Sequence, residues 1–459
     1  MSTMGPGLLN RMREYFESGA TRPISFRKEQ LRKLKAAIYA YEKEIGQAIY
    51  ADLKKSAEEV YSTETGLLIA EINVTLSHLD EWTRPKNVGT NLMNLPSSSK
   101  IYRDPLGVIF IIAPWNYPFQ LSLIPLVGAI AGGNCALIKP SELAPATSAI
   151  LDKIIGQIYS TEYIAVIEGD GAELVPSIMK SFRFDHIFYT GSIPVGKAIY
   201  QLAAADLIPV TLELGGKNPA IVENDAKIAV TVKRIAVGKF INAGQICVAP
   251  DYVLVHTDIQ QEFVDAMKKT LQDFYGERPI ESNEYGKIIN ERRFNKLLSY
   301  LSSSEIIYGG QHDKSKLFIS PTIILNPALD SGLMSEEIFG PILPVVSFRT
   351  MDDAKKIIRL NPNPLSLYVF TSDQSKEKAW IEQIPFGGGC INNAAWQFTN
   401  PHLPFGGIGQ SGMGAYHGKY SFDLFTHAKP VMKTPVWIDP SIKYPPYSGK
   451  LKWFKRLIR

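Results

Sequence analysis

A single thiol, Cys247, lies between a helical pattern and an apolar run of strand length. A turn between two such elements can hold a thiol rigidly and still leave it exposed. Only the thiolate is a good nucleophile, so a reactive cysteine needs backbone N–H groups or a base that favours loss of its proton. A lone cysteine among apolar residues is more often an inert buried side chain, so the case for catalysis depends on its neighbours.

Two other side chains are suited to a reaction at that thiol. Asn116 lies in a turn with two prolines, and its N–H donors can stabilise a developing oxyanion or simply bond to its own backbone. Glu213 leaves an apolar strand just before two glycines. Poor solvation raises the pKa of a carboxyl group at such a place and suits it to general-base catalysis, although it can also merely cap a turn.

Two further stretches have the character of a nucleotide site. Lys139 and Glu142 share one short loop, where they can bind ribose hydroxyl groups or form a plain surface ion pair. Gly191, Ser192 and Gly196 lie where a strand passes into a helix with a proline in its first turn, and free backbone N–H groups at such a helix start bind phosphate. This stretch lacks the G-x-G-x-x-G fingerprint, so by itself it indicates a dinucleotide only weakly.

The elements that must position these residues alternate between apolar strands and helices. We expect strands over 108–112, 136–138, 163–167 and 186–189, and helices over 121–133, 144–159 and 171–181 between them. Strands buried on both faces and joined by helices indicate a doubly wound parallel sheet, whose ligand site lies at the carboxyl ends of the strands. The polar stretches around Asn116, Lys139, Ser192 and Glu213 fall at such ends.

The rest of the chain predicts further elements. Helices are expected over 25–50 and 63–82, and residues 83–104 predict an irregular excursion or hairpin of the kind that often meets another subunit. In the second half, 262–275 predicts a crossover helix and 365–370 a buried strand. The predicted fold class is α/β, with a doubly wound, Rossmann-like parallel-sheet domain, a second α/β domain and a small oligomerisation arm.

Composition narrows the classes of protein to consider. A chain of 459 residues exceeds what one core usually supports, and its net charge of +4 is too dilute to indicate nucleic-acid binding. The three cysteines lack CxxC spacing and the seven histidines form no ligand pair, so we expect no metal site and a reducing, cytoplasmic compartment. The N-terminus does not have a signal-peptide pattern, and the apolar run 121–133 is interrupted by a proline and shorter than the roughly 20 residues of a membrane span.

These stretches also form an ordered series. In chain order they are Pro114-Trp115-Asn116, Lys139-Pro140-Ser141-Glu142, Thr190-Gly191-Ser192 with Gly196, Glu213-Leu214-Gly215-Gly216-Lys217, Gly244-Gln245-Ile246-Cys247, Glu336-Glu337-Ile338-Phe339-Gly340-Pro341 and Leu403-Pro404-Phe405-Gly406-Gly407. With this series the chain resembles the aldehyde dehydrogenase superfamily over essentially residues 10–440. The stretches 247–252 and 418–423 and a short N-terminus resemble its class 3 members, the group that includes fatty aldehyde dehydrogenases.

The resemblance implies a covalent mechanism. Cys247 would attack the carbonyl carbon of an aldehyde, and Asn116 and the backbone N–H of Cys247 would hold the tetrahedral oxyanion. After hydride transfer to the nicotinamide, Glu213 would activate the water that hydrolyses the thioester. The implied substrates are aliphatic or aromatic aldehydes of medium to long chain, with Phe405 and Trp396 as candidates for an apolar entrance. The individual aldehyde stays open.

The resemblance also implies a nicotinamide cofactor. It assigns the adenosine ribose to Lys139 and Glu142. Because the Glu142 carboxylate repels a 2′-phosphate, we expect NAD, while NADP remains possible because Lys139 acts in the opposite sense. The other implied contacts are Gly191, Ser192 and Gly196 at the pyrophosphate, Glu337 and Phe339 at the nicotinamide ribose, and Trp115 beside Asn116.

The family pattern suggests how the domains and subunits are arranged. Residues 1–82 and 105–212 would form the NAD(P)-binding domain, residues 213–395 the catalytic domain, and residues 83–104 and 396–459 the oligomerisation arm, the substrate entrance and the C-terminal tail. A homodimer is implied. The last twelve residues are basic and amphipathic and can touch an anionic membrane surface, but we favour packing of this tail on a partner subunit.

Two other functions fit parts of the sequence. A cysteine-dependent ester hydrolase would need Cys247 and Glu213 but not the phosphate-binding turn at Gly191. A dinucleotide-binding or scaffold protein without enzymatic activity would predict an unreactive Cys247. The complete series of motifs favours the dehydrogenase over both.

Overall fold

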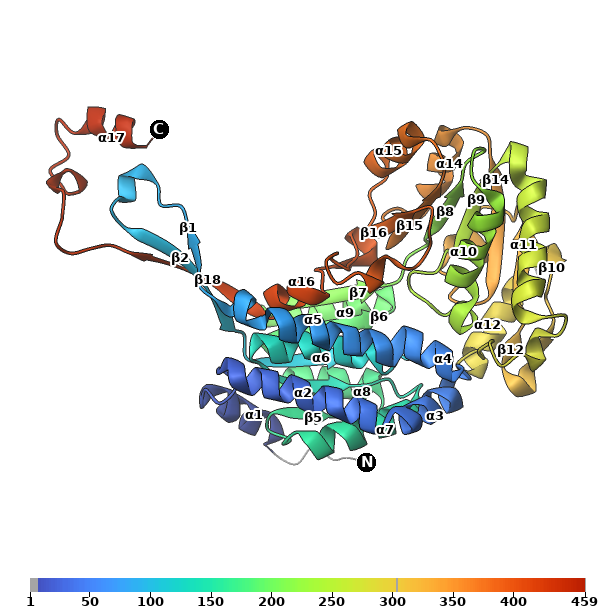
Figure 1. Cartoon of the computed structure of the whole chain (residues 1–459), viewed down its shortest axis with the longest axis horizontal. Helices are drawn as coiled ribbons and strands as arrows, with labels where there is room; N and C mark the ends of the chain where they lie inside the picture. The colour runs from blue at the N-terminus through green and yellow to red at the C-terminus, as the bar shows by residue number, and fades with distance from the viewer. Residues whose placement is uncertain (1–6, 303, 459) are drawn as a thin grey trace.

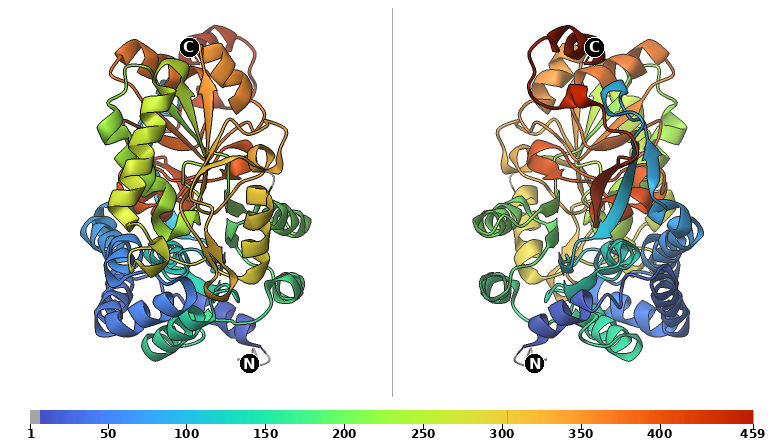
Figure 2. Two further views of the ribbon diagram at one scale, coloured as in Figure 1. Left: turned by 90° about the vertical axis from the view of Figure 1, so that its right-hand side faces the viewer. Right: turned by 90° about the vertical axis from the view of Figure 1, so that its left-hand side faces the viewer.

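Two large sheets and a projecting arm organise residues 7–302 and 304–458, which the computed structural model describes (Figure 1). The strand order is β17-β7-β6-β3-β4-β5 in the first sheet, β10-β13-β14-β9-β8-β15-β16 in the second, and β1-β2-β18 in the arm. Helices cover both faces of the two large sheets (Figure 2). This arrangement confirms the predicted α/β class.

The first sheet is doubly wound, as its apolar strands predict. It consists of β3 (Val108–Ile112), β4 (Cys135–Lys139), β5 (Ile164–Val166), β6 (His186–Gly191) and β7 (Val210–Leu214), all parallel, with β17 (Gly412–Met413) antiparallel to β7. Every residue of β3 and β4 is buried. Since β3 pairs with β4 on one side and β6 on the other, the strand order reverses at β3. Ligands of such sheets bind at this switch point, beyond the carboxyl ends of the strands.

The connections of this sheet are helical. They are α6 (Gln120–Gly132), α7 (Pro145–Ile158), α8 (Gly171–Ser181) and α9 (Ile193–Ala205), and before them come α1 (Leu8–Glu17), α2 (Ile24–Ala40), α3 (Glu42–Leu53), α4 (Ala57–Val60) and α5 (Gly66–Thr83). In Figure 1, α2, α5 and α6 lie side by side over one face of the sheet. Their buried apolar faces form one core with the strands.

The prediction of a single helix over 25–50 is wrong. The chain departs from helical geometry at Tyr41, with φ −105° and ψ 12°, and continues as the separate helix α3. The predicted apolar face is still buried on both sides of the break, at Leu31, Leu34, Ile38, Ile45 and Ile49. The helix predicted over 63–82 also begins earlier, as a π-helical turn, Tyr61–Thr65, that leads into α5.

The second sheet carries the other half of the chain. Its parallel strands are β8 (Pro219–Val222), β9 (Tyr252–His256), β13 (Thr322–Leu325), β14 (Ile342–Phe348), β15 (Ser366–Phe370) and β16 (Gly388–Ile391), with β10 (Ile306–Tyr308) antiparallel at one edge. The helices are α10 (Ile228–Phe240), α11 (Gln260–Tyr275), α12 (Glu291–Ser302), α13 (Gly332–Ser335), α14 (Met351–Ile358) and α15 (Gln374–Gln383), and a small hairpin pairs β11 (His312–Asp313) with β12 (Phe318–Ile319). The predicted helix over 262–275 and strand over 365–370 are both present.

The arm joins two distant parts of the chain. The hairpin predicted within 83–104 forms from β1 (Lys86–Val88) and β2 (Ser98–Pro105), and β18 (Thr426–Lys433) pairs with β2 along its whole length. The arm projects away from the second sheet and ends in α17 (Leu451–Leu457). Among the described residues, no helix combines the length and the apolar character that a membrane crossing requires.

Part of the C-terminal region returns to the first sheet before it reaches the arm. Gly412 and Met413 form β17 beside β7, and α16 (Gly418–Leu424) packs against α6. The carboxyl end of β7, where Glu213 lies, is therefore flanked by a strand from near the C-terminus.

Candidate active site

The Cys247 thiol lies on the predicted turn between a helix and a strand. After α10, Asn242 and Ala243 adopt left-handed backbone angles, with φ 51° and 50°, and Gly244 follows with φ 75°. A Cβ on Gly244 would lie 2.3 Å from the Gly340 carbonyl oxygen, so only glycine fits there. This sharp bend leaves Cys247 partly exposed just before β9.

The side chain of Asn218 fixes the backbone of the loop that carries the thiol. Its Nδ2 donates to the carbonyl oxygens of Cys247 at 2.7 Å and Ala249 at 3.1 Å, and its Oδ1 accepts from the backbone N–H of Ser366 at 2.8 Å. Asn218 begins the approach to β8, so the second sheet holds the position of the thiol.

Asn116 follows β3, and its side chain is buried next to the loop that carries Cys247. Its Nδ2 donates one hydrogen bond, 3.1 Å long, to the carbonyl oxygen of Gln245, and not to its own turn. A carboxamide nitrogen carries two hydrogens. Among the described residues this second N–H meets no other acceptor, so it is available to an oxygen atom in the cleft that Asn116 and Cys247 both line.

Glu213 lies at the carboxyl end of β7 with only 3% of its surface exposed. Neither of its carboxyl oxygens has a hydrogen-bond partner within the described part of the chain. Burial raises the pKa of this carboxyl well above its usual range, in the direction that the sequence predicts. A buried carboxyl group without partners, facing a cavity, is suited to exchange a proton with a bound reactant.

The thiol itself rests in its protonated form. Burial and the nearby carboxyl groups of Glu337 and Glu213 raise the pKa of Cys247 to about 12, while the backbone N–H groups of Cys247 and Val248 act in the opposite direction. The N–H groups that a reactive cysteine needs are thus present, but burial outweighs them. The thiol must lose its proton when a reactant changes these surroundings.

A cleft opens at the switch point of the first sheet, as the fold predicts. It is lined by residues of the first sheet and its connections and by loop and helix residues from the second half of the chain: Pro114, Trp115, Asn116, Leu121, Thr190, Gly191, Ser192, Glu213, Leu214, Gly215, Cys247, Arg292, Arg293, Glu337 and Phe339. The structure therefore brings the predicted Trp115, Gly191, Ser192, Glu337 and Phe339 together with the catalytic candidates. Lys139, Glu142 and Gly196 do not line this cleft.

These three residues have other places. Lys139 ends β4, is almost fully buried and forms an ion pair with the half-exposed Glu142, so the pair is more than a plain surface contact. Gly196 lies inside α9, where a Cβ would meet the Leu214 side chain at 2.6 Å. Its lack of a side chain lets α9 pack closely against β7, the part that the third glycine plays in dinucleotide folds.

Glu337 reaches into the cleft from the second half of the chain. Its Oε1 accepts from the backbone N–H of Gly216 at 3.3 Å, and burial, together with the charge of Asp251, raises its pKa to about 8. A Cβ on Gly215 would lie 2.0 Å from its Oε2, so glycine is required beside it. Phe339 adopts a left-handed φ of 49°, and its ring meets the Trp115 ring edge to face at 5.3 Å.

The cleft fits a dinucleotide. Ser192 precedes α9 without capping it through its side chain, which leaves the first N–H groups of this 13-residue helix free for phosphate. Glu337 places a carboxyl group in the same cleft as the Cys247 thiol. Arg292 and Arg293 of α12 also line the cleft, and sequence reasoning missed them because a helix 45 residues beyond the thiol has no motif that connects it to the site.

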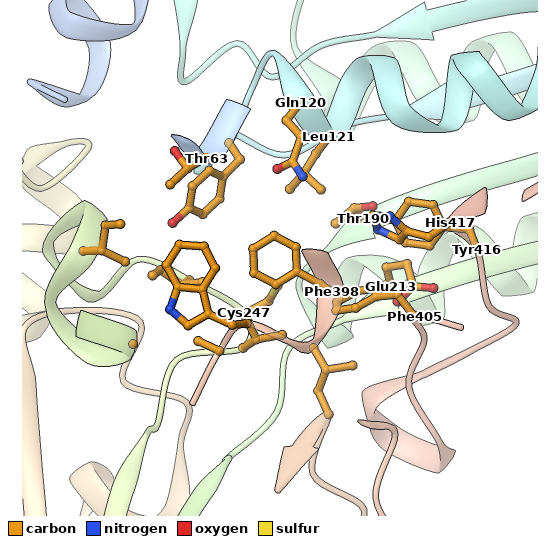
Figure 3. A pocket seen from close by; sticks show the side chains of 18 of the residues that line it. Thr63, Gln120, Leu121, Thr190, Glu213, Cys247, Phe398, Phe405, Tyr416 and His417 are labelled. Atoms are coloured by element: carbon orange, nitrogen blue, oxygen red, sulfur yellow. The ribbon is translucent and has the colours of Figure 1, made fainter. Parts of the chain in front are cut away.

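A second, strongly apolar cavity also reaches the thiol (Figure 3). Its wall consists of Thr63, Tyr117, Gln120, Leu121, Thr190, Glu213, Leu214, Val237, Gly238, Ile241, Ile246, Cys247, Val248, Leu365, Ala395, Trp396, Phe398, Phe405, Tyr416 and His417. Phe405 and Trp396, the aromatic side chains considered for an apolar entrance, both line this cavity. Sequence reasoning missed Thr63, Gln120 and His417, although His417 directly precedes a motif that supports the resemblance.

Comparison with known proteins decides the family. The sequence profile of the aldehyde dehydrogenase family matches residues 8–431 of this chain. The chain belongs to the aldehyde dehydrogenase family. The 4,4′-diaponeurosporen-aldehyde dehydrogenase of Staphylococcus aureus is 46% identical over 97% of each chain, and aldehyde dehydrogenase family 3 member A2 of Mus musculus is 43% identical over 97% of this chain and 92% of its own. These relatives confirm the resemblance to class 3.

Solved structures agree with this assignment. The substrate-bound state of Staphylococcus aureus AldH superposes with a TM-score of 0.96 and 45% identity, covering 98% of this chain and 99% of its own. Aldehyde dehydrogenase from Bacillus cereus in complex with NAD+ has a TM-score of 0.85 and 25% identity, covering 93% and 88%. The glyceraldehyde-3-phosphate dehydrogenase GapN of Methanocaldococcus jannaschii, complexed with NADP, has a TM-score of 0.85 and 25% identity, covering 93% of each chain.

This aldehyde dehydrogenase therefore oxidises aldehydes to carboxylic acids with a nicotinamide cofactor. The comparisons support neither the ester hydrolase nor the protein without enzymatic activity.

Proposed function

We propose that this enzyme oxidises apolar aldehydes of medium to long chain, aliphatic or aromatic, through a thioester on Cys247. One observation carries the proposal. The apolar cavity and the cofactor cleft share Cys247 and Glu213, together with Leu121, Thr190 and Leu214. A substrate in the cavity and a cofactor in the cleft would both reach the thiol, which is the geometry that covalent oxidation requires.

Each step has a residue suited to it. Cys247 adds to the carbonyl carbon of the aldehyde, and the free N–H of Asn116 and the backbone N–H of Cys247 stabilise the resulting oxyanion. NAD(P), when bound, supplies the acceptor for the hydride that leaves the tetrahedral adduct. Glu213 then takes a proton from the water that attacks the thioester, because its raised pKa makes it a stronger base than an exposed carboxylate.

The cavity wall supports apolar substrates. The rings of Trp396 and Phe398 stack at 6.5 Å, and the Phe398 and Phe405 rings meet edge to face at 6.4 Å. Such a wall accepts an alkyl chain or an aromatic ring and provides few polar partners. Among the relatives, the one from Staphylococcus aureus is named for 4,4′-diaponeurosporen-aldehyde, so we include that aldehyde among the proposed substrates.

For the cofactor, we propose a preference for NAD. The Glu142 carboxylate forms an ion pair with Lys139, which occupies the ammonium group and adds a negative charge beside it. A 2′-phosphate placed at this pair would be repelled by the carboxylate. NADP remains the alternative cofactor.

We also propose a cytoplasmic homodimer that forms through the arm. The three free cysteines suit a reducing compartment and support a cytoplasmic location. The dimer is supported by the exposed apolar side chains of Val431 and Met432 in the arm and of Trp437 just after it. The tail that follows would pack on the partner subunit in preference to a membrane surface.

The test follows the absorbance of the reduced nicotinamide. Native protein and Cys247→Ala are supplied with NAD or NADP and with short aliphatic, long aliphatic and aromatic aldehydes. We expect reduction that depends on Cys247, is faster with NAD and is most efficient with long aliphatic or aromatic aldehydes. Preference for short, polar aldehydes would contradict the proposed substrate class.

A further inference from the structure

The turn that carries Asn116 is bonded to a buried ion pair between Lys55 and Glu64. These two side chains line neither the cofactor cleft nor the apolar cavity. Lys55 lies in the short link between α3 and α4, and Glu64 lies in the π-helical turn Tyr61–Thr65. Their Nζ and Oε1 atoms are 2.7 Å apart, and both side chains are fully buried. Removing two charges from water is costly, so such a pair persists only where further hydrogen bonds satisfy both groups.

Here the further bonds all go to one turn. Lys55 Nζ donates to the backbone carbonyl oxygen of Asn116 at 3.0 Å and lies 3.7 Å from the centre of the Tyr117 ring. Glu64 Oε2 accepts from the backbone N–H groups of Phe119 at 3.0 Å and Gln120 at 3.2 Å, where α6 begins. The ammonium therefore holds the turn at Asn116, and the carboxylate holds its end at Phe119 and Gln120.

The same carbonyl oxygen is tied to the thiol loop. Asn242 Nδ2 donates to the carbonyl oxygens of Asn116 at 2.8 Å and Gln245 at 3.1 Å. Gln245 is also the acceptor for the Asn116 side chain. The position of the Asn116 carboxamide relative to Cys247 is thus set at its backbone by Lys55 and Asn242 and at its side chain by Gln245.

We propose that Lys55, paired with Glu64, is a positioning residue for oxyanion stabilisation: it holds the Asn116 turn so that the free N–H of the carboxamide points to the carbonyl oxygen of the substrate. The inference rests on the proposed role of Asn116 as an oxyanion donor. Lys55 would act through Asn116, since its own side chain lines neither the cofactor cleft nor the apolar cavity. Its removal should therefore slow acylation of Cys247 and leave cofactor affinity unchanged.

A double-mutant cycle tests this dependence. The neutral-pair variant Lys55→Met/Glu64→Gln removes both charges of the ion pair together, so that neither partner stays buried without the other. It is compared with native protein, with Asn116→Ala and with the triple variant. The readouts are the burst of p-nitrophenol from p-nitrophenyl acetate without any cofactor, the burst of reduced NAD with an aldehyde, and the dissociation constant of NAD.

We expect Asn116→Ala to slow both bursts about a hundredfold and the neutral-pair variant to slow them about tenfold. The triple variant should be no slower than Asn116→Ala alone, and NAD affinity should be unchanged in all. A neutral-pair variant with native bursts, or a triple variant slowed by a further factor of about ten, would overturn the inference, since a merely structural effect adds to the loss of Asn116. If Asn116→Ala kept native bursts, the role of Asn116 and the inference would both fail.

Two further variants serve as a control and as a replacement for a variant that fails to fold. The exposed ion pair between Lys153 and Glu44, 3.4 Å apart on α7 and α3, supplies the matched control Lys153→Met/Glu44→Gln, for which we expect native bursts. If the neutral-pair variant does not fold, as judged by circular dichroism, Glu64→Asp takes its place, because the shorter carboxylate cannot reach Lys55 and both amides. Its bursts should be slowed in the native background and not in Asn116→Ala, and equal slowing in both backgrounds would overturn the inference.

Discussion

At the scale of single residues, the site combines acidic groups whose protonation differs from that in water. Burial raises the pKa of Glu213 well above its usual range, that of Cys247 to about 12 and, together with the charge of Asp251, that of Glu337 to about 8. With so high a pKa, the Cys247 thiol is protonated at neutral pH until a reactant changes its surroundings. The chemistry then depends on how the reactants alter these protonation states.

The charge of Glu337 should control the reactivity of the free thiol. Its carboxylate raises the Cys247 pKa, and with its own pKa near 8 it carries that charge only at higher pH. We expect Glu337→Gln to be alkylated by iodoacetamide on the order of threefold faster than native protein at pH 9, and at a similar rate at pH 6, where Glu337 is protonated anyway. Glu336→Gln, which alters the exposed neighbouring carboxylate, is the control. Equal rates at pH 9 would contradict the assigned cause.

Glu142 should decide between the two cofactors. Glu142→Gln removes the carboxylate and frees the Lys139 ammonium for a phosphate group. We expect kcat/KM with NADP to rise about tenfold relative to that with NAD. Steady-state rates with each cofactor measure this ratio, and Lys139→Met should shift it the other way. An unchanged ratio would place the adenosine ribose elsewhere.

At the scale of elements, the ends of three parallel strands bring the site together. Asn116 follows β3, Ser192 follows β6 and Glu213 lies in β7, and all three line the cleft, while Lys139 ends the neighbouring β4 outside it. The second sheet contributes the thiol through the loop before β9, with Glu337 in the approach to β14. The glycines between these elements let backbone and side chains come close enough to share one cleft.

Gly215 shows how narrow this fit is. In Gly215→Ala the new Cβ would lie 2.0 Å from the Glu337 Oε2 atom and would push that carboxylate out of place. We expect NAD to bind about tenfold more weakly, since a hydrogen bond to a charged group contributes roughly 1.5 kcal/mol or more. Fluorescence titration measures the affinity. Gly46→Ala, in α3 with open space around it, is the matched control, and native affinity in Gly215→Ala would show that Glu337 does not contact the cofactor.

The sequence predicts these elements better than it predicts their supports. Apolar runs bounded by Gly and Pro locate the strands of the first sheet, and polar residues at their ends give the main members of the site. The break at Tyr41 carries no Gly or Pro signal, and the π-helical turn that places Glu64 follows an ordinary helical pattern. Lys55, Arg292 and Arg293 lie far from the motifs in sequence, so only the folded chain shows that the two arginines line the cleft and that Lys55 bonds to the Asn116 carbonyl oxygen.

At the scale of the whole molecule, the sheet of the arm ends in an edge strand, β18. β18 pairs with β2 along one side, and among the described strands none pairs with its other side. Unpaired N–H and C=O groups along an edge strand are a ready template for another chain, and Val431 and Met432 add exposed apolar surface there. The proposed dimer would cover both features.

The arm should therefore set the state of assembly. We expect the native protein to have twice the 51.0 kDa of one chain when measured by light scattering after gel filtration. Val431→Glu/Met432→Glu should shift it toward the monomer, because the charges would have to be buried at the interface. A monomeric native protein, or a double variant that stays dimeric, would contradict assembly through β18.

The central claim is that the acyl group passes through Cys247. The most direct measurement is the intact mass of Glu213→Gln after mixing with NAD and a long-chain aldehyde and quenching in acid. With the base removed, hydrolysis should slow about a hundredfold or more, so we expect one acyl group per chain, located on the Cys247 peptide and absent in Glu213→Gln/Cys247→Ala. Formation of reduced NAD over many turnovers without any acyl group on Cys247 would contradict the account.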